Sequence, residues 1–157
     1  MTLLLPINIV GNRSVKFMLK IQKEFINQIQ RHGEKTFPEE CVGVLLGKQG
    51  ASQREVIAVL PLENSAASKE VEFSVSPKEL QKVEQAAILQ NLDVIGFYHS
   101  HANFEAVASE KDKAFAFPGF SYPIVQVLDG KATDIKSYSF IDDFEFKKFS
   151  EEELICQ

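Results

Sequence analysis

The chain has 157 residues, a formal net charge of −5 and no cluster of Lys and Arg. This length fits one domain that buries a single core, and the acidic charge argues against a nucleic-acid partner. Cys41 and Cys156 form no CxxC motif, so the sequence indicates neither a disulfide framework nor a thiolate zinc site, and we expect a reducing, cytoplasmic location. No stretch reaches the roughly 20 apolar residues of a membrane span.

The first residues are apolar, but Pro6 interrupts them, and they lack the positive start and cleavage site of a signal peptide. We expect residues 1–17 to be an N-terminal extension. From Val15 to His32 apolar residues recur at helical spacing, with Gly33 as a stop, which predicts an amphipathic helix against a sheet. The apolar positions of this helix are Met18, Ile21, Phe25 and Ile29.

Strands and a second helix follow. The apolar run 42–47 predicts a strand, residues 56–62 its hairpin partner, and 71–75 a further short strand. Ser76, Pro77 and Glu79 predict the start of a helix with a capping box. We expect this helix to run to about Gln90 and to end at Asn91. The residues expected to face the sheet are Leu80, Val83, Ala87 and Ile88.

Two histidines come at the end of the next apolar run. Residues 93–98 predict a buried strand, and His99 and His101 follow it. Because residues i and i+2 of a strand point to the same face, the two imidazoles should project side by side. Ser100 should point to the opposite face and make a supporting hydrogen bond. An isolated H-x-H pair is more often structural, so other residues must decide whether it binds a metal.

A carboxylate follows in the next element, after a loop over residues 102–108. Residues 109–117 predict a short helix, and Asp112 on it would complete a shell of two imidazoles and one carboxylate, which leaves a fourth zinc position for water. Alternatively, Ser109 and Asp112 are only a capping box. We expect that Ser109 can cap the helix and still serve the site, whereas Asp112 cannot do both.

The remaining residues predict strands and a tail. Residues 122–128 and 135–141 read as strands around the turn at 129–130, and 144–146 as an edge strand. Residues 150–157 read as an acidic tail with one helical turn. The residues of an aromatic cluster expected in the core are Phe115, Phe117 and Phe120.

The motif residues together resemble the JAMM signature of the MPN-plus (JAB) metalloproteases, E…H-[ST]-H-x7-S-x2-D. All its positions are filled, by Glu40, His99, Ser100, His101, Ser109 and Asp112. Residues 38–47 also resemble the family segment P-x-E-x-x-[GA]-x-L-x-G, and Ala102 replaces the proline that usually follows the second histidine. The resemblance covers residues 18–149. It implies a single-domain, prokaryotic-type α/β fold, with a curved mixed sheet flanked by helices and related to that of the cytidine deaminases.

The resemblance also assigns roles. His99, His101 and Asp112 would hold one zinc ion per chain with a catalytic water. Glu40 would be the general base and later the acid, with Glu39 as the rival. The resemblance implies that the Ser109 hydroxyl would stabilise the oxyanion.

Two further residues each have two possible roles. Phe104 is a candidate for lining a substrate groove, with a place in the core as the alternative. Cys41 fits a buried thiol better than a nucleophile. Other known zinc-binding motifs are absent, because the sequence has neither H-E-x-x-H nor the deaminase pattern of H-x-E with P-C-x-x-C.

These features predict a zinc-dependent peptidase or isopeptidase. The resemblance implies that it cuts after the C-terminal Gly-Gly of a ubiquitin-like or sulfur-carrier protein, whose tail would lie against a sheet edge. Two alternatives stay open: a non-catalytic MPN scaffold that binds partners, and a zinc hydrolase acting on small molecules.

Overall fold

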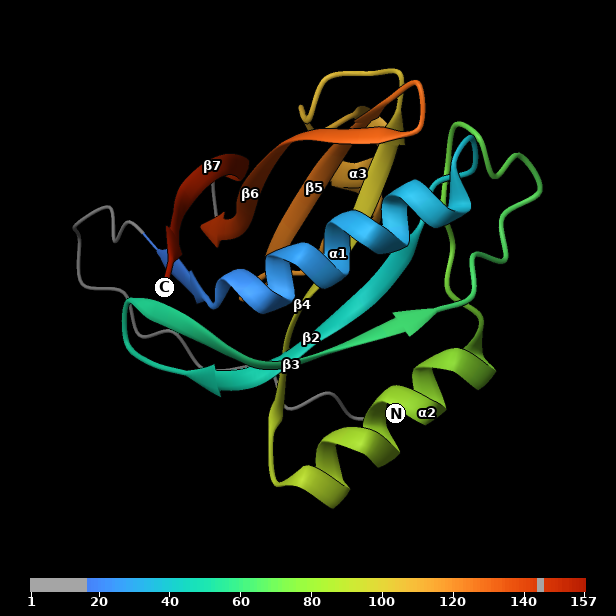
Figure 1. The fold of residues 1–157 in the computed structure, drawn as a ribbon. Coiled ribbons are helices and arrows are strands. Elements are labelled where there is room, and N and C mark those ends of the chain that lie inside the picture. Colours follow the sequence, from blue (N-terminus) through green and yellow to red (C-terminus); the bar gives the residue numbers. More distant parts are fainter. Residues whose placement is uncertain (1–16, 144–145) are drawn as a thin grey trace.

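The described residues, 17–143 and 146–157, form one seven-stranded mixed sheet in the computed structural model of the protein (Figure 1). The elements in chain order are β1 (Met18–Ile21), α1 (Lys23–Thr36), β2 (Val42–Gln49), β3 (Gln53–Leu62), α2 (Pro77–Gln90), β4 (Asp93–Ala102), α3 (Glu110–Phe115), β5 (Ser121–Leu128), β6 (Lys131–Asp143) and β7 (Phe146–Cys156). The strand order is β1-β3-β2-β4-β5-β6-β7.

The sheet contains both parallel and antiparallel pairs of neighbouring strands. β1 runs parallel to β3 and to β7, and β4 runs parallel to β5, whereas the remaining neighbours are antiparallel. The predicted α/β fold with a mixed sheet flanked by helices is therefore confirmed, as is the hairpin of β2 and β3. The pairing of β1 with β7 closes the sheet into a barrel, a closure that the sequence did not predict.

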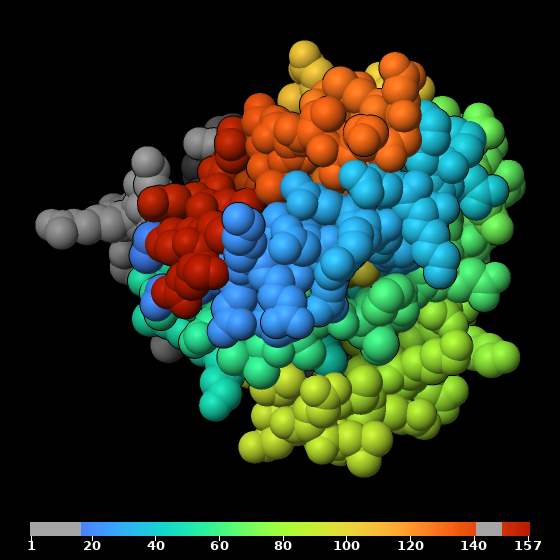
Figure 2. Space-filling model, in the orientation of Figure 1, coloured from blue at the N-terminus to red at the C-terminus, as the bar shows by residue number. Residues whose placement is uncertain are grey.

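Apolar side chains pack on both faces of the sheet. On one face α1 lies across the strands (Figure 1), and its side chains form the middle of the surface seen in Figure 2. This layer includes Ile26, Ile29, Leu45, Ile95, Tyr98 and Val125. The other face carries the apolar residues of α2 and the loop before β5, and it includes Val42, Val44, Val83, Ala87, Phe97, Phe120 and Ile124. A central strand such as β4 is thus buried on both sides.

The first predicted helix begins too early. Residues 18–21 form β1, where Leu19 and Ile21 are buried and Met18 and Lys20 are partly exposed, the period of two of a strand. Pairing with two neighbouring strands outweighs the local helical spacing, and α1 begins only at Lys23. The predicted extension lies outside the described residues, except for Phe17.

The predicted helical turn in the acidic tail is also wrong. Residues 150–156 belong to β7, which pairs with β6 on one side and β1 on the other. The acidic residues fit a strand because Glu151 and Glu153 are exposed, whereas Glu152 alone points inward and meets Arg54. Of the edge strand predicted at 144–146, residues 144 and 145 lie outside the described residues, and Phe146 begins β7.

The second predicted helix is confirmed, with a different cap. The Ser76 hydroxyl accepts a hydrogen bond from the Glu79 N–H, and Asn91 ends α2 in a left-handed conformation. The Glu79 carboxylate does not complete a capping box with Ser76, because it accepts from the Glu63 N–H instead. The predicted inward position of Ile88 is wrong: it is 78% exposed, because the buried stripe runs through Val83 and Ala87.

Two further predictions are corrected. Residues 71–75 form no strand, because the backbone of Ser74 bonds to Asn64 and Ser65 rather than to a neighbouring strand. In the aromatic cluster Phe120 is buried and Phe115 half-buried, but Phe117 is 45% exposed. None of the helices in the described residues has the length and apolar character needed to cross a membrane.

We expect Gly96→Ala to destabilise the fold strongly. Gly96 lies on β4 opposite Ser121 of β5, and a Cβ there would lie 2.0 Å from the Ser121 backbone oxygen. The clash is with backbone, so relief requires separating the strands, and we expect a loss of about 3 kcal/mol of unfolding free energy in urea titrations. Gly50→Ala is the comparison, because its nearest atom is 3.0 Å away in an exposed turn. Equal losses in both variants would contradict the argument.

Candidate metal centre

β4 places its two histidines on one face of the sheet. It lies between β2 and β5, with His99 opposite Val42 and Ile124. His99 and His101 are 2% and 4% exposed, and both point away from the face on which α1 packs. Ser100 between them points to the opposite face, where its hydroxyl accepts a hydrogen bond of 2.7 Å from the Cys41 N–H. Strand alternation alone therefore brings the two imidazoles together.

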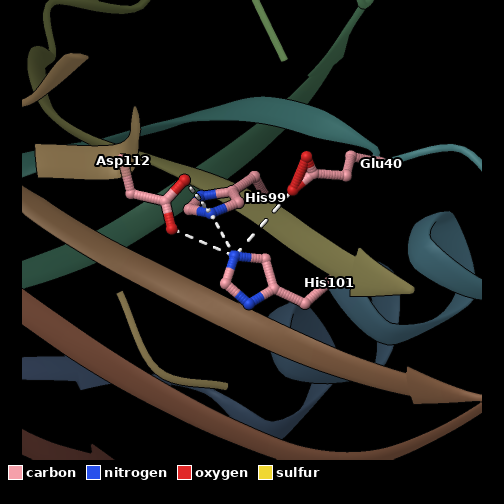
Figure 3. A group of neighbouring side chains, drawn as sticks. All are labelled: Glu40, His99, His101 and Asp112. Atoms are coloured by element: carbon pink, nitrogen blue, oxygen red, sulfur yellow. Dashed lines mark hydrogen bonds and ion pairs between the residues drawn. The ribbon is translucent and has the colours of Figure 1, made fainter. Parts of the chain in front are cut away.

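The imidazoles meet two carboxylates from other elements (Figure 3). The Nε2 atoms of His99 and His101 lie 3.2 Å apart. Asp112 places Oδ1 3.0 Å from the first Nε2 and Oδ2 3.0 Å from the second. Glu40, which precedes β2, places Oε1 3.8 Å from the Nε2 of His101. One donor atom from each of the four residues lies within 4.8 Å of all the others, an arrangement that could hold a metal ion.

Asp112 serves the helix and the site together. Ser109 is the N-cap of α3, its hydroxyl accepts from the Asp112 N–H at 3.2 Å, and its own N–H donates to Asp112 Oδ2 at 2.8 Å. Asp112 was expected not to cap the helix and bind zinc at once. In the structure it caps α3 and still directs its carboxylate at both histidines, because a carboxylate has two oxygens with about four lone-pair directions. Oδ2 accepts the capping bond and still faces His101, while Oδ1 faces His99.

Hydrogen bonding and packing orient the two rings differently. The Nδ1 of His101 lies 2.7 Å from the Glu105 carbonyl oxygen, so it carries the proton and leaves Nε2 directed at the site. The Nδ1 of His99 has no partner among the described residues. The Phe73 ring instead packs on His99 with 4.5 Å between centroids. Neither Phe73 nor the Glu105 carbonyl was identified from the sequence, since both act only through contacts that the folded chain creates.

Glu40 and Glu39 have different surroundings. Glu39 is exposed, whereas Glu40 is 3% exposed and directed at the histidines. Burial raises the pKa of the Glu40 carboxyl to about 7, although His101 acts in the opposite direction. One of its oxygens, Oε2, has no hydrogen-bond partner within the described residues. A buried carboxylate with a free oxygen and a pKa near neutrality can exchange a proton with a group in the site.

At the other three residues, burial and the neighbouring charged groups shift the side-chain pKa in opposite directions. Burial lowers the pKa of His99. It also opposes the charged form of His101, but hydrogen bonds to Asp112 and to the Glu105 carbonyl prevail and raise the pKa of His101. At Asp112, burial opposes ionisation, but hydrogen bonds from both histidines prevail and hold the pKa of that carboxyl below its usual range. Asp112 is therefore an anion, which favours a cation between it and the two imidazoles.

The spacing of the donor atoms fits one shared metal ion. Two nitrogens about 2.0–2.1 Å from one tetrahedral zinc ion lie about 3.3 Å from each other. The observed separations of 3.2 Å between the Nε2 atoms and 3.0 Å from each to Asp112 are close to this value. Two imidazoles and one carboxylate also match the donor set of open, three-ligand catalytic sites. The residues present therefore suit such an ion.

The other candidate residues lie around this centre. Ser109 is exposed at the start of α3, and Phe104 is 49% exposed with its ring edge-on to His101, 6.2 Å between centroids. Cys41 is buried, and burial raises the pKa of its thiol to about 12, which opposes thiolate chemistry. Ala102 continues β4 by pairing with Val127, so the missing proline does not end the strand early.

Comparison with known proteins identifies the class of this fold and site. Residues 22–141 match the family described as prokaryotic homologs of the JAB domain, and the chain belongs to this family. This confirms the family predicted from the JAMM-like residues.

Individual relatives carry more specific names. The chain is 37% identical to the desampylase of Haloferax volcanii over 97 residues, which cover 61% of this chain and 68% of the relative. It is 28% identical to the CysO-cysteine peptidase of Mycobacterium tuberculosis, with 80% and 85% covered. A solution structure of a Desulfitobacterium hafniense protein superposes with a TM-score of 0.76 at 29% identity, covering 89% of this chain and 93% of that one. Relatives named as peptidases agree with the predicted hydrolase class.

Asp112→Ala and Ser109→Ala should separate the two functions of the α3 cap. Both remove a capping bond and should cost about 1 kcal/mol of unfolding free energy, but only Asp112→Ala removes a donor atom of the site. We expect Asp112→Ala to weaken zinc binding at least about 100-fold and Ser109→Ala to leave it nearly unchanged, measured by titration of chelator-treated protein. Full zinc occupancy in Asp112→Ala would contradict this assignment.

The stability of metal-free protein should report the raised pKa of Glu40. Between about pH 4.5 and 7 the folded protein holds a proton on Glu40 that the unfolded chain releases. This contribution to stability is complete below pH 4.5 and is lost as the pH rises through 7. Relative to Glu40→Gln, which does not titrate, the wild type should lose about 3 kcal/mol between pH 4 and 8. Urea unfolding with chelator measures this, and a constant difference would contradict it.

Proposed function

We propose that the protein is a zinc-dependent metallopeptidase or isopeptidase. The observation that carries this proposal is the convergence of two imidazole nitrogens and one carboxylate beside a second, buried carboxylate with a free oxygen. In this proposal one zinc ion per chain is held by His99, His101 and Asp112. When bound, it supplies a Lewis acid that polarises the scissile carbonyl and lowers the pKa of a water molecule to about 7.

Glu40 moves the proton in this scheme. Its carboxylate accepts the proton of the attacking water and later donates it to the departing amine, so no free acid or base is needed. In the metal-free protein burial raises the pKa of Glu40 to about 7, and the charge of a bound zinc ion would lower it and favour the carboxylate form that accepts the proton. Ser100 supports this part of the site, since its hydroxyl holds the N–H of Cys41, the residue after Glu40, at 2.7 Å.

Ser109 stabilises the oxyanion. In the cap of α3 its oxygen accepts a hydrogen bond from the Asp112 N–H, so its own hydroxyl proton is free to be donated. Because Ser109 is exposed at the edge of the site, this proton can point to the carbonyl oxygen of a bound substrate, where negative charge develops during attack. The cap and the oxyanion interaction use different parts of the same hydroxyl.

The proposed substrate is a ubiquitin-like or sulfur-carrier protein, cut after its C-terminal Gly-Gly. The names of the relatives, a desampylase and a CysO-cysteine peptidase, support this class. The half-exposed Phe104 beside His101 supports a role as one wall of a narrow groove. Glycines suit such a groove because they carry no Cβ. We further propose a reducing, cytoplasmic location, in keeping with two free cysteines.

The direct test uses zinc-loaded protein and a panel of ubiquitin-like and sulfur-carrier proteins with short C-terminal extensions. Intact mass is measured with and without chelator. We expect loss of the extension after the second glycine, abolished by chelator and restored by zinc. Cleavage that persists in chelator, or cleavage of unstructured peptides at unrelated sequences, would overturn the proposal.

Glu40→Gln should remove turnover and keep the metal. Loss of proton transfer should reduce kcat by about 10²- to 10⁴-fold, while zinc content, measured by mass spectrometry, stays at the wild-type level. Glu39→Gln is the matched control, because it changes the neighbouring, exposed carboxylate in the same way. An active Glu40→Gln, or an equal loss in both variants, would assign the proton transfer to another group.

A further inference from the structure

The segment between β3 and α2, residues 63–76, contains neither helix nor strand and lies against Glu40. Glu40 precedes β2 at Val42, so its backbone groups lie outside the strand ladder although the residue is buried. Such groups need partners. The Glu40 N–H donates to the Lys69 carbonyl at 2.7 Å, and the Glu40 carbonyl accepts from the side-chain amide of Asn64 at 3.0 Å.

Asn64 uses all four of its hydrogen-bonding positions. Besides the bond to Glu40, its Nδ2 donates to the Glu72 carbonyl at 3.1 Å, and its Oδ1 accepts from the N–H groups of Ala66 at 3.0 Å and Ser74 at 3.2 Å. This pattern fixes the orientation of the amide, because a flipped group would oppose two carbonyls with an oxygen and two N–H groups with an NH₂. Asn64 is only 9% exposed, so lost bonds would not be replaced freely by water.

The same segment also contacts the other side of the metal centre. The Phe73 ring packs on His99 at 4.5 Å, and Glu72 pairs with Lys111 of α3 at 3.0 Å, next to Asp112. The backbone carbonyl of Glu72 is one of the four partners of Asn64. A single buried amide therefore ties together the backbone of Glu40 and the segment that touches His99 and α3.

The Glu40 carboxylate itself has little to hold it. Oε2 has no partner in the described residues, and Oε1 approaches His101 only to 3.8 Å, which is too long for a hydrogen bond. The position of this carboxylate therefore depends on the backbone that carries it. That backbone is held by Lys69 and Asn64 on one side and, through Cys41, by Ser100 on the other.

We propose that Asn64 is a positioning residue, which sets the Glu40 carboxylate for proton transfer by anchoring the Glu40 carbonyl to the segment 63–76. This rests on the proposed function, in which Glu40 moves the proton. None of the four hydrogen bonds of Asn64 goes to His99, His101 or Asp112, so we expect its loss to act on kcat through Glu40 and to spare metal binding.

Two variants distinguish the two hydrogen bonds that the Asn64 amide donates from the contribution of its side-chain shape. Asn64→Ala removes all four hydrogen bonds. Asn64→Asp keeps the shape and the acceptor for Ala66 and Ser74, but it removes both donors and places an oxygen against the Glu40 carbonyl. We expect each variant to lower kcat by about 10- to 100-fold, with a smaller change in KM and with wild-type zinc content. Ser65→Ala, an exposed neighbour in the same segment, is the control and should behave as the wild type.

Amide hydrogen exchange provides a readout that needs no activity. The Glu40 N–H donates to the Lys69 carbonyl of the segment that Asn64 anchors. In Asn64→Asp this N–H should therefore exchange at least about tenfold faster, while the amides of α1 keep their wild-type rates. Each of four results would overturn the proposal and leave Asn64 a merely structural residue. They are a wild-type kcat in Asn64→Asp, unchanged exchange of the Glu40 amide, loss of zinc, and faster amide exchange throughout the chain. If the wild type cleaves no substrate, the proposed function fails by itself. The exchange rate at Glu40 then still decides whether Asn64 anchors that residue.

Discussion

The candidate metal centre depends on the alternation of side chains along β4. His99 and His101 reach the same face because they are two residues apart, and their Nε2 atoms lie 3.2 Å apart. Burial between β2 and β5 holds the register, since a slip of one residue would replace both imidazoles by Tyr98 and Ser100. The close approach of Gly96 to Ser121 restricts such a slip further. This central strand thus supplies half of the four residues of the candidate site.

The other half comes from elements that the strand does not control. Asp112 lies on α3, a helix of only six residues whose first turn is closed by the cap with Ser109. Because the same carboxylate closes that cap and faces both histidines, the order of the helix and the geometry of the centre are linked. Glu40 lies just before the start of β2, where hydrogen bonds with the segment 63–76 replace the missing strand ladder.

Local signals predicted much of this arrangement, and their failures have a common cause. The spacing of His99, His101, Ser109 and Asp112 indicated the centre, and the start of α2 was readable from Ser76 and Pro77. The helix predicted to include residues 18–21 and the turn predicted at the acidic tail are both strands, because β1 pairs with β3 and β7, and β7 pairs with β6 and β1. The pairing of β1 with β7 joins residues more than a hundred positions apart, so no local pattern in the sequence identifies the partner strand.

The sequence by itself therefore determined the residue types of the candidate centre, the placing of both imidazoles on one face of a strand, and the family to which the chain belongs. These follow from period-two geometry and from donor chemistry, which act over a few residues. Only the tertiary structure decided that Glu40 rather than Glu39 is buried, that Asp112 can cap and face the histidines together, and that Asn64 holds the backbone of Glu40. Each of these depends on atoms brought together from separate elements, and a buried polar group finds its partner only when the folded chain excludes water.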